Sequence, residues 1–463
     1  MAKQKGLNII IVGCGKVGET LVEQLSKEGH DITVIDKKAD RVQTLANTYD
    51  VMGMVGNGAS YSTQVEAGIE NTDLLIAVTE SDELNLLCCT VAKRVANCSA
   101  IARVRNPDYA QEVSYLQEKL GLAMIINPDL EAAKEAARVL YLPTALDVNP
   151  FAHGQAEMVN FKIPAGNILD GMMLMDMSKN FPAAIETNLL ICAIERDGKV
   201  YIPKGNFRMA QGDVVSVVST SKTVRQFLRT IGLNTKQVKS AMIIGGGRSA
   251  FYLAQELLSA GIEVRIIERD SERCEELSVL LPKAIIINGD GSDEELLREE
   301  GLDYAEAFVP LTGIDEENIL LTLHARKHSN AKVVTKINRM TFRDAISSLD
   351  LGSVIYPRYI TSESILAYVR AKKNSMNSNV ETLYNLFENR VEAIEFRINE
   401  ASAVTGKPLK ELGKKMKKDV LIAFINRDGK ILIPSGNDSI EAGDTVMLVT
   451  THTGFNDIQD ILA

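Results

Sequence analysis

Residues 8–18 of the 463-residue chain read NIIIVGCGKVG, and this stretch decides the fold. Its apolar run predicts a buried strand, and the glycines after it have the G-x-G-x-x-G spacing at which a helix opens directly after a strand. In that pattern Gly13 permits a tight turn, Gly15 lets the backbone approach a pyrophosphate, and Gly18 permits close packing of helix on strand. The stretch therefore predicts a dinucleotide-binding βαβ unit.

The chain repeats itself at an offset of about 232 residues, and SAMIIGGGRSA (240–250) is the second copy of the opening stretch. Further blocks match in the same order in both halves, as when ICAIERDGKVYIPKGN (191–206) faces IAFINRDGKILIPSGN (422–437). We interpret this as a duplication in which a larger unit and a smaller unit alternate. The expected domains are a larger pair, 1–145 and 238–372, and a smaller pair, 146–232 and 378–463.

The larger unit alternates short apolar runs with helical patterns, and its runs are NIIIVG, DITVID, VMGMVG, LLIAVT and SAIARV. Strands that alternate with helices predict βαβ units and a parallel, doubly wound sheet, which is an α/β fold. The smaller unit has short apolar runs joined by RDGK, and Asp-Gly between apolar runs indicates a hairpin. We therefore expect two Rossmann-like units, each followed by a small α+β domain.

Asp36 ends the second predicted strand of the first unit, eighteen residues after Gly18. A carboxylate at this position accepts hydrogen bonds from ribose hydroxyls, and it disfavours the 2′-phosphate of NADP. The alternative is that Asp36 only caps the turn that follows it. Lys16 places a cation inside the glycine loop, near the phosphates of its own site or of a neighbouring subunit.

Other candidate residues follow the carboxyl ends of later strands, where open α/β sheets bind their ligands. Gly56-Asn57 follows the third strand and Thr79-Glu80 follows the fourth. Thr79 could instead cap the next helix. Arg103 ends the fifth strand, where it either reaches a phosphate or is only solvated at the surface.

The second half keeps the loop as Gly245 to Ala250, with alanine in place of the third glycine. Glu268 stands where the first half has Asp36, Thr312-Gly313 stands for Thr79-Glu80, and Lys336 stands for Arg103. The residue types permit a second, weaker nucleotide site, and they equally permit an empty unit that only supports the fold.

The net charge of −10 disfavours binding to nucleic acid or to an anionic bilayer. No apolar run reaches the ~20 residues that span a bilayer, so no direct membrane insertion is expected. The six cysteines form no CxxC pair, and they are interpreted as reduced, mostly buried thiols with no metal site.

A dehydrogenase needs an acid or base beside its cofactor, and the small units offer no such pair. None of the five histidines has a counterpart in the other half. We therefore expect no catalytic residues and no enzymatic activity, with an NAD-dependent oxidoreductase as the alternative.

With its motifs GCGKVG, VID, GNGAS, AVTESDELN and ARVRNPDY, and with the RDGK series of the small units, the whole chain resembles the TrkA family. That family comprises peripheral regulatory subunits of Trk potassium uptake systems, built from RCK or KTN domains. The resemblance implies a homotetramer, cytoplasmic and docked on the inner face of the cell membrane through a membrane-embedded potassium-translocating subunit. It also implies that NAD(H) and ATP or ADP bind the Rossmann units and gate transport.

Carried over residue by residue, the resemblance assigns nucleotide contacts to both glycine loops and to the strand ends behind them. They are Gly13, Cys14, Gly15, Lys16, Val17, Gly18, Asp36, Gly56, Asn57, Thr79, Glu80 and Arg103 in the first half, and Gly245, Gly246, Gly247, Arg248, Ser249, Glu268, Thr312, Gly313 and Lys336 in the second. A regulator of another cation transporter remains an alternative, because the surface that faces the partner is not identifiable in the sequence.

Overall fold

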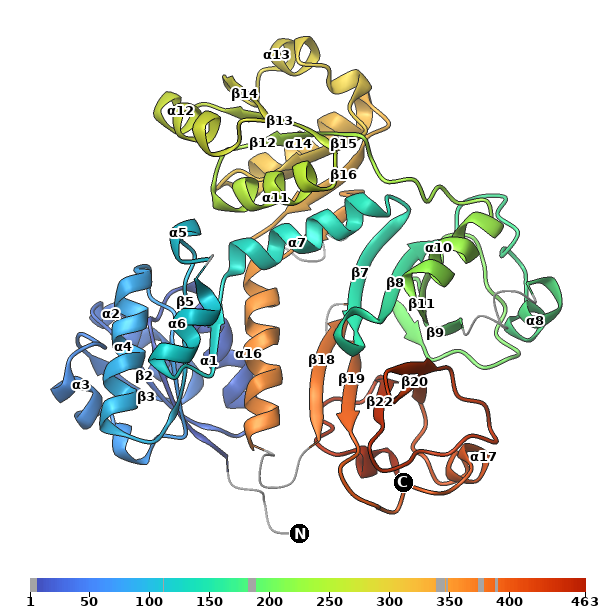
Figure 1. Ribbon diagram of the computed structural model, residues 1–463, viewed down its shortest axis with the longest axis horizontal. Coiled ribbons are helices and arrows are strands. Elements are labelled where there is room, and N and C mark those ends of the chain that lie inside the picture. Colours follow the sequence, from blue (N-terminus) through green and yellow to red (C-terminus); the bar gives the residue numbers. More distant parts are fainter. Residues whose placement is uncertain are drawn as a thin grey trace.

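The fold consists of two parallel sheets and two antiparallel sheets, arranged as two large and two small units (Figure 1). The computed structural model describes residues 6–110, 112–181, 189–338, 346, 349–373, 379–387 and 390–463. The predicted domain limits at residues 1 and 378 lie outside this part of the chain.

The first large unit is a six-stranded parallel sheet of order β3-β2-β1-β4-β5-β6. The inner strands β1 and β4 are buried almost throughout, as expected for a parallel sheet covered by helices on both faces. Its strands are β1 (Asn8–Val12), β2 (Asp31–Asp36), β3 (Met52–Val55), β4 (Leu74–Ala77), β5 (Ser99–Arg103) and β6 (Met124–Ile126). Its helices are α1 (Lys16–Lys27), α2 (Ala39–Tyr49), α3 (Tyr61–Glu66), η1 (Ile69–Asn71), α4 (Asp82–Val95), α5 (Pro107–Ala110), α6 (Val113–Leu120) and α7 (Pro128–Tyr141).

The second large unit repeats this topology in the order β14-β13-β12-β15-β16-β17. Its strands are β12 (Ser240–Ile244), β13 (Glu263–Glu268), β14 (Ile285–Asn288), β15 (Ala307–Pro310), β16 (Lys332–Lys336) and β17 (Ser353–Ile355). Its helices are α11 (Arg248–Ser259), α12 (Ser271–Leu280), α13 (Glu294–Glu299), η4 (Leu302–Tyr304), α14 (Asp315–His328) and α16 (Pro357–Lys373). The predicted α/β fold and the duplication are confirmed, and a sixth strand that the apolar runs did not indicate completes each parallel sheet.

The small units are antiparallel sheets of five strands, in the orders β10-β9-β11-β8-β7 and β18-β19-β22-β20-β21. The Asp-Gly turn between β9 and β10 has φ of +50° and +74°, as the predicted tight hairpin requires. The first small unit contains β7 (Ala145–Phe151), η2 (Ala152–Gly154), β8 (Ala156–Lys162), η3 (Leu174–Asp176), α8 (Met177–Asn180), β9 (Leu190–Arg196), β10 (Lys199–Tyr201), β11 (Val214–Ser219) and α10 (Ser221–Thr230). The second contains β18 (Val380–Leu386), β19 (Val391–Arg397), α17 (Leu409–Leu412), β20 (Val420–Arg427), β21 (Lys430–Leu432), β22 (Thr445–Thr450) and η5 (Ile458–Ile461).

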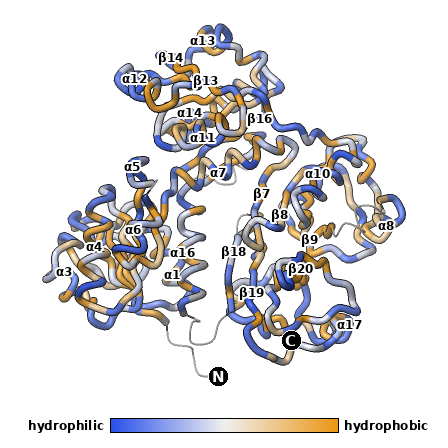
Figure 2. The backbone as a smooth tube through the Cα atoms, in the orientation of Figure 1, coloured by the Kyte–Doolittle hydropathy of each residue, from blue (hydrophilic) through white to orange (hydrophobic). Residues whose placement is uncertain are grey.

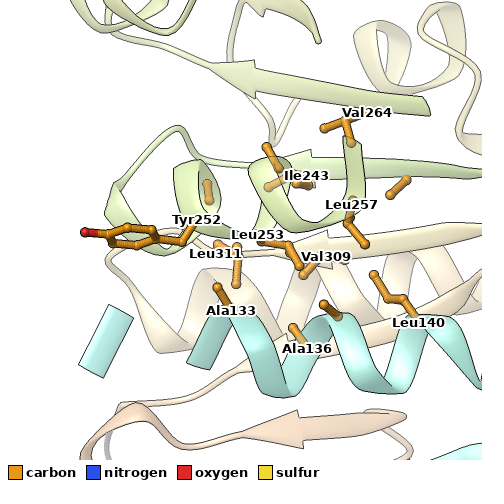
Figure 3. Packing of buried hydrophobic residues seen from close by; sticks show 14 of the residues in the cluster. Ala133, Ala136, Leu140, Ile243, Tyr252, Leu253, Leu257, Val264, Val309 and Leu311 are labelled. Atoms are coloured by element: carbon orange, nitrogen blue, oxygen red, sulfur yellow. The ribbon is translucent and has the colours of Figure 1, made fainter. Parts of the chain in front are cut away.

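The two large units exchange their last helices. α7 follows β6 of the first sheet but packs against α11 of the second unit, where Ala133, Ala136 and Leu140 face Leu253 and Leu257 (Figure 3). In return, α16 follows β17 of the second sheet and packs against α1, placing its buried residues in the first unit's core. The two large units are therefore joined by a shared core.

The two small units also share a core. Phe151 of β7 lies edge-on to Tyr384 of β18, with ring centroids 4.7 Å apart, and to Phe424 of β20 at 6.5 Å. In Figure 2, much of β9, β14 and β20 is apolar, β7 and β18 are mixed, and many of the outer connections are hydrophilic. Within the described residues, no helix is both long enough and apolar enough to cross a bilayer.

Candidate nucleotide site

The first glycine loop has the geometry that its spacing predicts. Gly13 has φ +106°, and its N–H donates to the Ile35 carbonyl at 2.8 Å, which ties the loop to β2. A Cβ on Gly18 would lie 1.9 Å from the Gly13 carbonyl oxygen, so only glycine lets α1 pack this close to the loop. A Cβ on Gly15 would meet no atom within 4 Å. The middle of the loop is therefore open to an approaching ligand.

Helix α1 begins directly after this opening. Gly15 is its N-cap residue and offers no side chain to accept the first N–H groups of the helix. Unsatisfied N–H groups and the positive end of the helix dipole favour an anion at this position. The loop and the first turn of α1 can thus hold a phosphate group.

Asp36 braces this loop from the end of β2. Its Oδ2 accepts the Cys14 N–H at 2.7 Å, and its Oδ1 accepts the Lys38 N–H at 2.9 Å. The second bond is the turn cap considered as the alternative role, and the first links the carboxylate to the glycine loop. A carboxylate has about four acceptor positions, so both oxygens keep capacity for a ribose hydroxyl.

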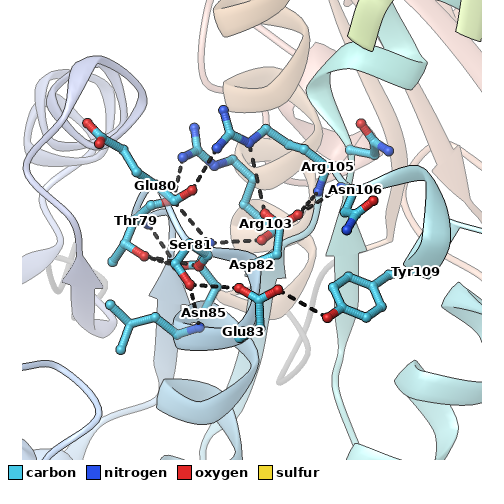
Figure 4. A network of polar contacts seen from close by, with 12 residues as sticks. Thr79, Glu80, Ser81, Asp82, Glu83, Asn85, Arg103, Arg105, Asn106 and Tyr109 are labelled. Atoms are coloured by element: carbon cyan, nitrogen blue, oxygen red, sulfur yellow. Dashed lines mark hydrogen bonds and ion pairs between the residues drawn. The ribbon is translucent and has the colours of Figure 1, made fainter. Parts of the chain in front are cut away.

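A buried amide joins the ends of β4 and β5 behind the loop (Figure 4). Asn85 accepts the Thr79 N–H at 2.8 Å and the Thr79 hydroxyl at 2.7 Å, and its amide donates to the Arg103 carbonyl at 2.8 Å. The cap of α4 is Ser81, whose hydroxyl accepts the Leu84 N–H at 3.1 Å. The suggestion that Thr79 caps this helix is therefore wrong, because its hydroxyl is engaged with Asn85.

Asp82 and Arg105 extend this network to the segment after β5 (Figure 4). Asp82 Oδ2 accepts the Arg105 and Asn106 N–H groups at 2.8 and 2.7 Å, and Arg105 Nη2 donates to the Glu80 carbonyl at 2.7 Å. Neither Asp82 nor Arg105 is among the site residues predicted from the sequence. The repeat held a signal, since Asp315 and Asn318 occupy the positions of Asp82 and Asn85 in the second half.

Arg103 is a buried cation at the end of β5. Its side chain is 8% exposed, so the alternative of surface solvation is wrong. Its Nη2 donates to the Thr79 carbonyl, while its Nε has no hydrogen-bond partner among the described residues. Burial lowers the pKa of Arg103 to about 10, which still leaves it charged at neutral pH. A buried, incompletely paired guanidinium favours an anionic ligand beside it.

These groups line a cavity of about 730 Å³ at the carboxyl ends of the first sheet's strands. From the predicted residues, the lining includes Gly13, Gly15, Lys16, Val17, Asp36, Gly56, Thr79, Glu80 and Arg103. Cys14, Gly18 and Asn57 are not part of the lining: the first two shape the loop, and Asn57 Oδ1 accepts the Ala59 N–H at 3.3 Å.

The cavity differs in charge from the protein as a whole. Seven cationic side chains and only four carboxylates line it, although the chain has a net charge of −10. The lining also includes residues of the second half, among them Gly313, which the sequence had assigned to a separate site. A negatively charged ligand in this cavity would therefore contact both halves.

The second glycine loop reproduces the bracing of the first. Gly245 donates to the Ile267 carbonyl at 2.8 Å, and Glu268 accepts the Gly246 and Asp270 N–H groups at 2.6 and 2.8 Å. Thr312 donates to Asn318 as Thr79 does to Asn85, and Lys336 Nζ donates to the Leu311 carbonyl at 2.9 Å. Burial lowers the pKa of Lys336, as it does for Arg103.

Among the described residues, the cysteine and histidine side chains form no comparable site. All six cysteines are buried and unbonded to one another, and desolvation raises the pKa of Cys88 and Cys192 to about 12. His324 and His328 lie with ring centroids 4.5 Å apart on α14. Across the described part of the chain, no group of three acidic, histidine or cysteine side chains is arranged to hold a metal ion.

The fold and the site together define a duplicated α/β protein, in which each Rossmann-like parallel sheet is followed by a small antiparallel domain. The TrkA-N domain family matches residues 9–128 and 241–357, and the TrkA-C domain family matches residues 158–232 and 393–463. The chain therefore belongs to the TrkA family, with both domains present twice.

Relatives extend this similarity over the whole length. The Trk system potassium uptake protein TrkA of Haemophilus influenzae is 30% identical over 96% of this chain and 95% of its own length. The TrkA homolog of Archaeoglobus fulgidus is 30% identical over 98% of this chain and 100% of its own.

Among solved structures, the GsuK channel superposes with a TM-score of 0.65 at 17% identity, covering 97% of this chain and 77% of that one. A structure of the same channel bound to NAD superposes with a TM-score of 0.63, also at 17% identity, with the same coverage. At this level of identity the likeness concerns the fold.

Proposed function

We propose that the chain is a cytoplasmic regulatory subunit of a potassium uptake system and binds NAD(H) or an adenine nucleotide in its first parallel-sheet unit. One observation carries this proposal: the positively charged cavity in which buried Arg103 lies near the open glycine loop. The names of the TrkA relatives support the potassium system, and the NAD-bound GsuK structure has the same fold.

The residues present fit a dinucleotide. The N–H groups at Gly15 and in the first turn of α1 would hold the pyrophosphate, with Lys16 and Arg103 balancing its charge. Asp36 would accept the ribose hydroxyls, and its carboxylate disfavours a 2′-phosphate. NAD(H), ATP and ADP fit this arrangement better than NADP.

Regulation would follow from the shape of the cavity. A ligand shifts a conformational equilibrium only if it binds the two states with different affinity. Because residues of both halves line the cavity, a bound nucleotide favours the arrangement in which the halves are close together. We propose that a homotetramer transmits this difference to a membrane-embedded potassium-translocating subunit of the Trk type.

Calorimetric titration of the full chain with NADH, NAD⁺, ATP and ADP tests the site. Asp36→Asn should weaken NADH binding by about 1–3 kcal/mol, the scale of a lost hydrogen bond to a charged group. Asp31→Asn is the matched control, because Asp31 is exposed at the opposite end of the same strand. Unchanged affinity in Asp36→Asn would remove Asp36 from the site.

Reconstitution tests the regulatory role. Together with a Trk-type membrane subunit in vesicles, the chain should change potassium flux when nucleotide is added, and native mass spectrometry should detect four copies. Oxidation or reduction of the nucleotide together with a metabolite, without any membrane partner, would instead establish an oxidoreductase.

A further inference from the structure

The two exchanged helices bring opposite charges to the two glycine loops. α7 and α16 each begin with a proline, and the next residue is Asp129 in α7 and Arg358 in α16. Proline is well suited to the first helical position, because its fixed φ matches the helix. Each helix packs on the other half of the chain. Asp129 therefore lies near the glycine loop of the second half, and Arg358 lies near the glycine loop of the first half.

The path of α16 places Arg358 at the first loop. At its far end Arg370 donates to Glu28, the residue at the end of α1, at 2.6 and 2.9 Å. Twelve residues separate Arg358 from Arg370, and twelve separate Lys16 from Glu28. Both segments therefore rise about 18 Å. Arg358 and Lys16 line the same cavity, and α16 packs against α1, so the two helices run side by side in the same direction with their first turns together.

Arg358 adds a cation from the second half to this cavity. The same lining includes Arg103 and Arg105 from the first half and Asn338 from the second. A guanidinium presents a planar fork of N–H donors that matches two phosphate oxygens at once. Tyr252 of α11 links the second half to the first beside this cavity, since its hydroxyl donates to the Arg105 carbonyl at 3.0 Å.

The second loop receives a carboxylate in the corresponding place. Asp129 Oδ1 accepts the Ser249 hydroxyl at 2.6 Å, in the first turn of α11, and Asp129 also lines the first cavity. On the other side of that loop, Arg273 Nε donates to the Gly246 carbonyl at 2.7 Å. A carboxylate at a helix N-terminus satisfies the dipole there and repels a phosphate.

We propose that Arg358 binds the phosphates of the nucleotide held by the first loop, and that Asp129 excludes phosphate from the second loop. The inference rests on the proposed nucleotide site and sharpens it: each chain takes one nucleotide, and the ligand is clamped between the two halves. The glycine loop of the second half then serves only to position α11 in the shared core.

The experiment is calorimetric titration of the full chain with ADP, NADH and adenosine. Arg358→Gln should weaken ADP and NADH at least tenfold and leave adenosine, which has no phosphate, unchanged. Arg358→Lys should recover part of the lost affinity for ADP and NADH. This variant still tests the inference if Arg358→Gln folds poorly. Arg94→Gln is the matched control, because Arg94 is an exposed arginine of α4 that does not line the cavity. It should bind one nucleotide per chain with wild-type affinity.

Each outcome decides the matter. Wild-type binding of one ADP per chain, lost in Arg358→Gln and kept in Arg94→Gln, supports the inference. If Arg358→Gln binds ADP as the wild type does, or if two nucleotides bind per chain, the inference is overturned while the proposed nucleotide binding stands. If the wild type binds neither ADP nor NADH, both are overturned.

Discussion

Arg370 and Glu28, which lie 342 residues apart in the sequence, form an ion pair with the Arg370 Nη2 and Glu28 Oε1 atoms 2.6 Å apart. The same guanidinium donates from Nη1 to Glu392 Oε1 at 3.2 Å, and Glu392 Oε2 accepts the Gly454 N–H at 3.1 Å. One side chain of α16 thus joins the end of α1 to the second small unit. Arg370 is 8% exposed, so the pair is largely removed from water.

Removing this cation should strongly destabilise the protein. Arg370→Met leaves the buried Glu392 carboxylate and the partly buried Glu28 carboxylate without their counterion, and breaking a buried pair in this way costs about 3–5 kcal/mol. Urea unfolding measures the loss. The control is Lys27→Met, which breaks an exposed pair with Glu23 and should change the free energy of unfolding by about 0.5 kcal/mol or less. Equal stability of the two variants would show that Arg370 is not a structural link.

The same pair gives stability a pH dependence. Pairing with Arg370 and the nearby His30, whose Nε2 lies 3.9 Å from Glu28 Oε2, outweigh desolvation and lower the pKa of Glu28 to about 2. A lowered carboxyl pKa contributes stability that is complete above the unfolded value, about 4.3, and is lost as the pH falls towards 2. Glu28→Gln should therefore cost roughly 3 kcal/mol at pH 7 and progressively less below pH 4.

The measurement is urea unfolding of both proteins between pH 7 and pH 3. Glu23→Gln serves as the control, because Glu23 pairs with Lys27 at the surface and should show almost no such trend. A stability difference between wild type and Glu28→Gln that stays constant over this range would contradict the assignment.

The sequence was sufficient for the fold and for half of the site. Glycine spacing, apolar runs and Asp36 are local features, and each predicts its own backbone geometry without reference to the rest of the chain. The repeat then established that the pattern occurs twice. The roles of Gly13 and Gly18 in shaping the loop follow from these local rules.

The helix exchange could not be predicted in this way. The buried face of α7 contains Ala132, Ala133 and Ala136, and an apolar face does not specify which sheet it covers. For the same reason Arg358 and Asp129 stand far from either loop in the sequence, and only the packing of α7 and α16 brings them there. Arg105 and the amide of Asn85 were missed because a buried polar network depends on the meeting of distant strand ends.

Adding a methyl group at Gly15 in the first loop should lower nucleotide affinity without changing the free energy of unfolding. Gly15 has open space around its missing Cβ and a φ of −77°, so Gly15→Ala should leave the free energy of unfolding within about 0.5 kcal/mol of the wild type. The methyl group would lie where the backbone must approach the pyrophosphate, so nucleotide affinity should fall at least tenfold, or about 1.4 kcal/mol.

Calorimetry and urea unfolding on the same samples check both parts. Gly247→Ala is the matched control, since that glycine also has open space and caps α11 in the second loop. It should change neither stability nor affinity. Unaltered nucleotide binding by Gly15→Ala would place the phosphates elsewhere.

The buried side-chain amides of Asn85 and Asn318 occupy equivalent positions in the two halves, but replacing them should affect ADP affinity differently. Asn85 and Asn318 are both fully buried, and each accepts from a threonine and donates to the carbonyl at the end of a neighbouring strand. Replacing either by alanine leaves buried backbone groups without partners, so each variant should lose about 3 kcal/mol of stability. Only Asn85→Ala displaces Arg103 and Thr79 in the cavity, so it alone should weaken ADP binding, by about tenfold or more. Urea unfolding and calorimetry on both variants measure the two effects, and a comparable loss of ADP binding in Asn318→Ala would mean that the second loop also holds nucleotide.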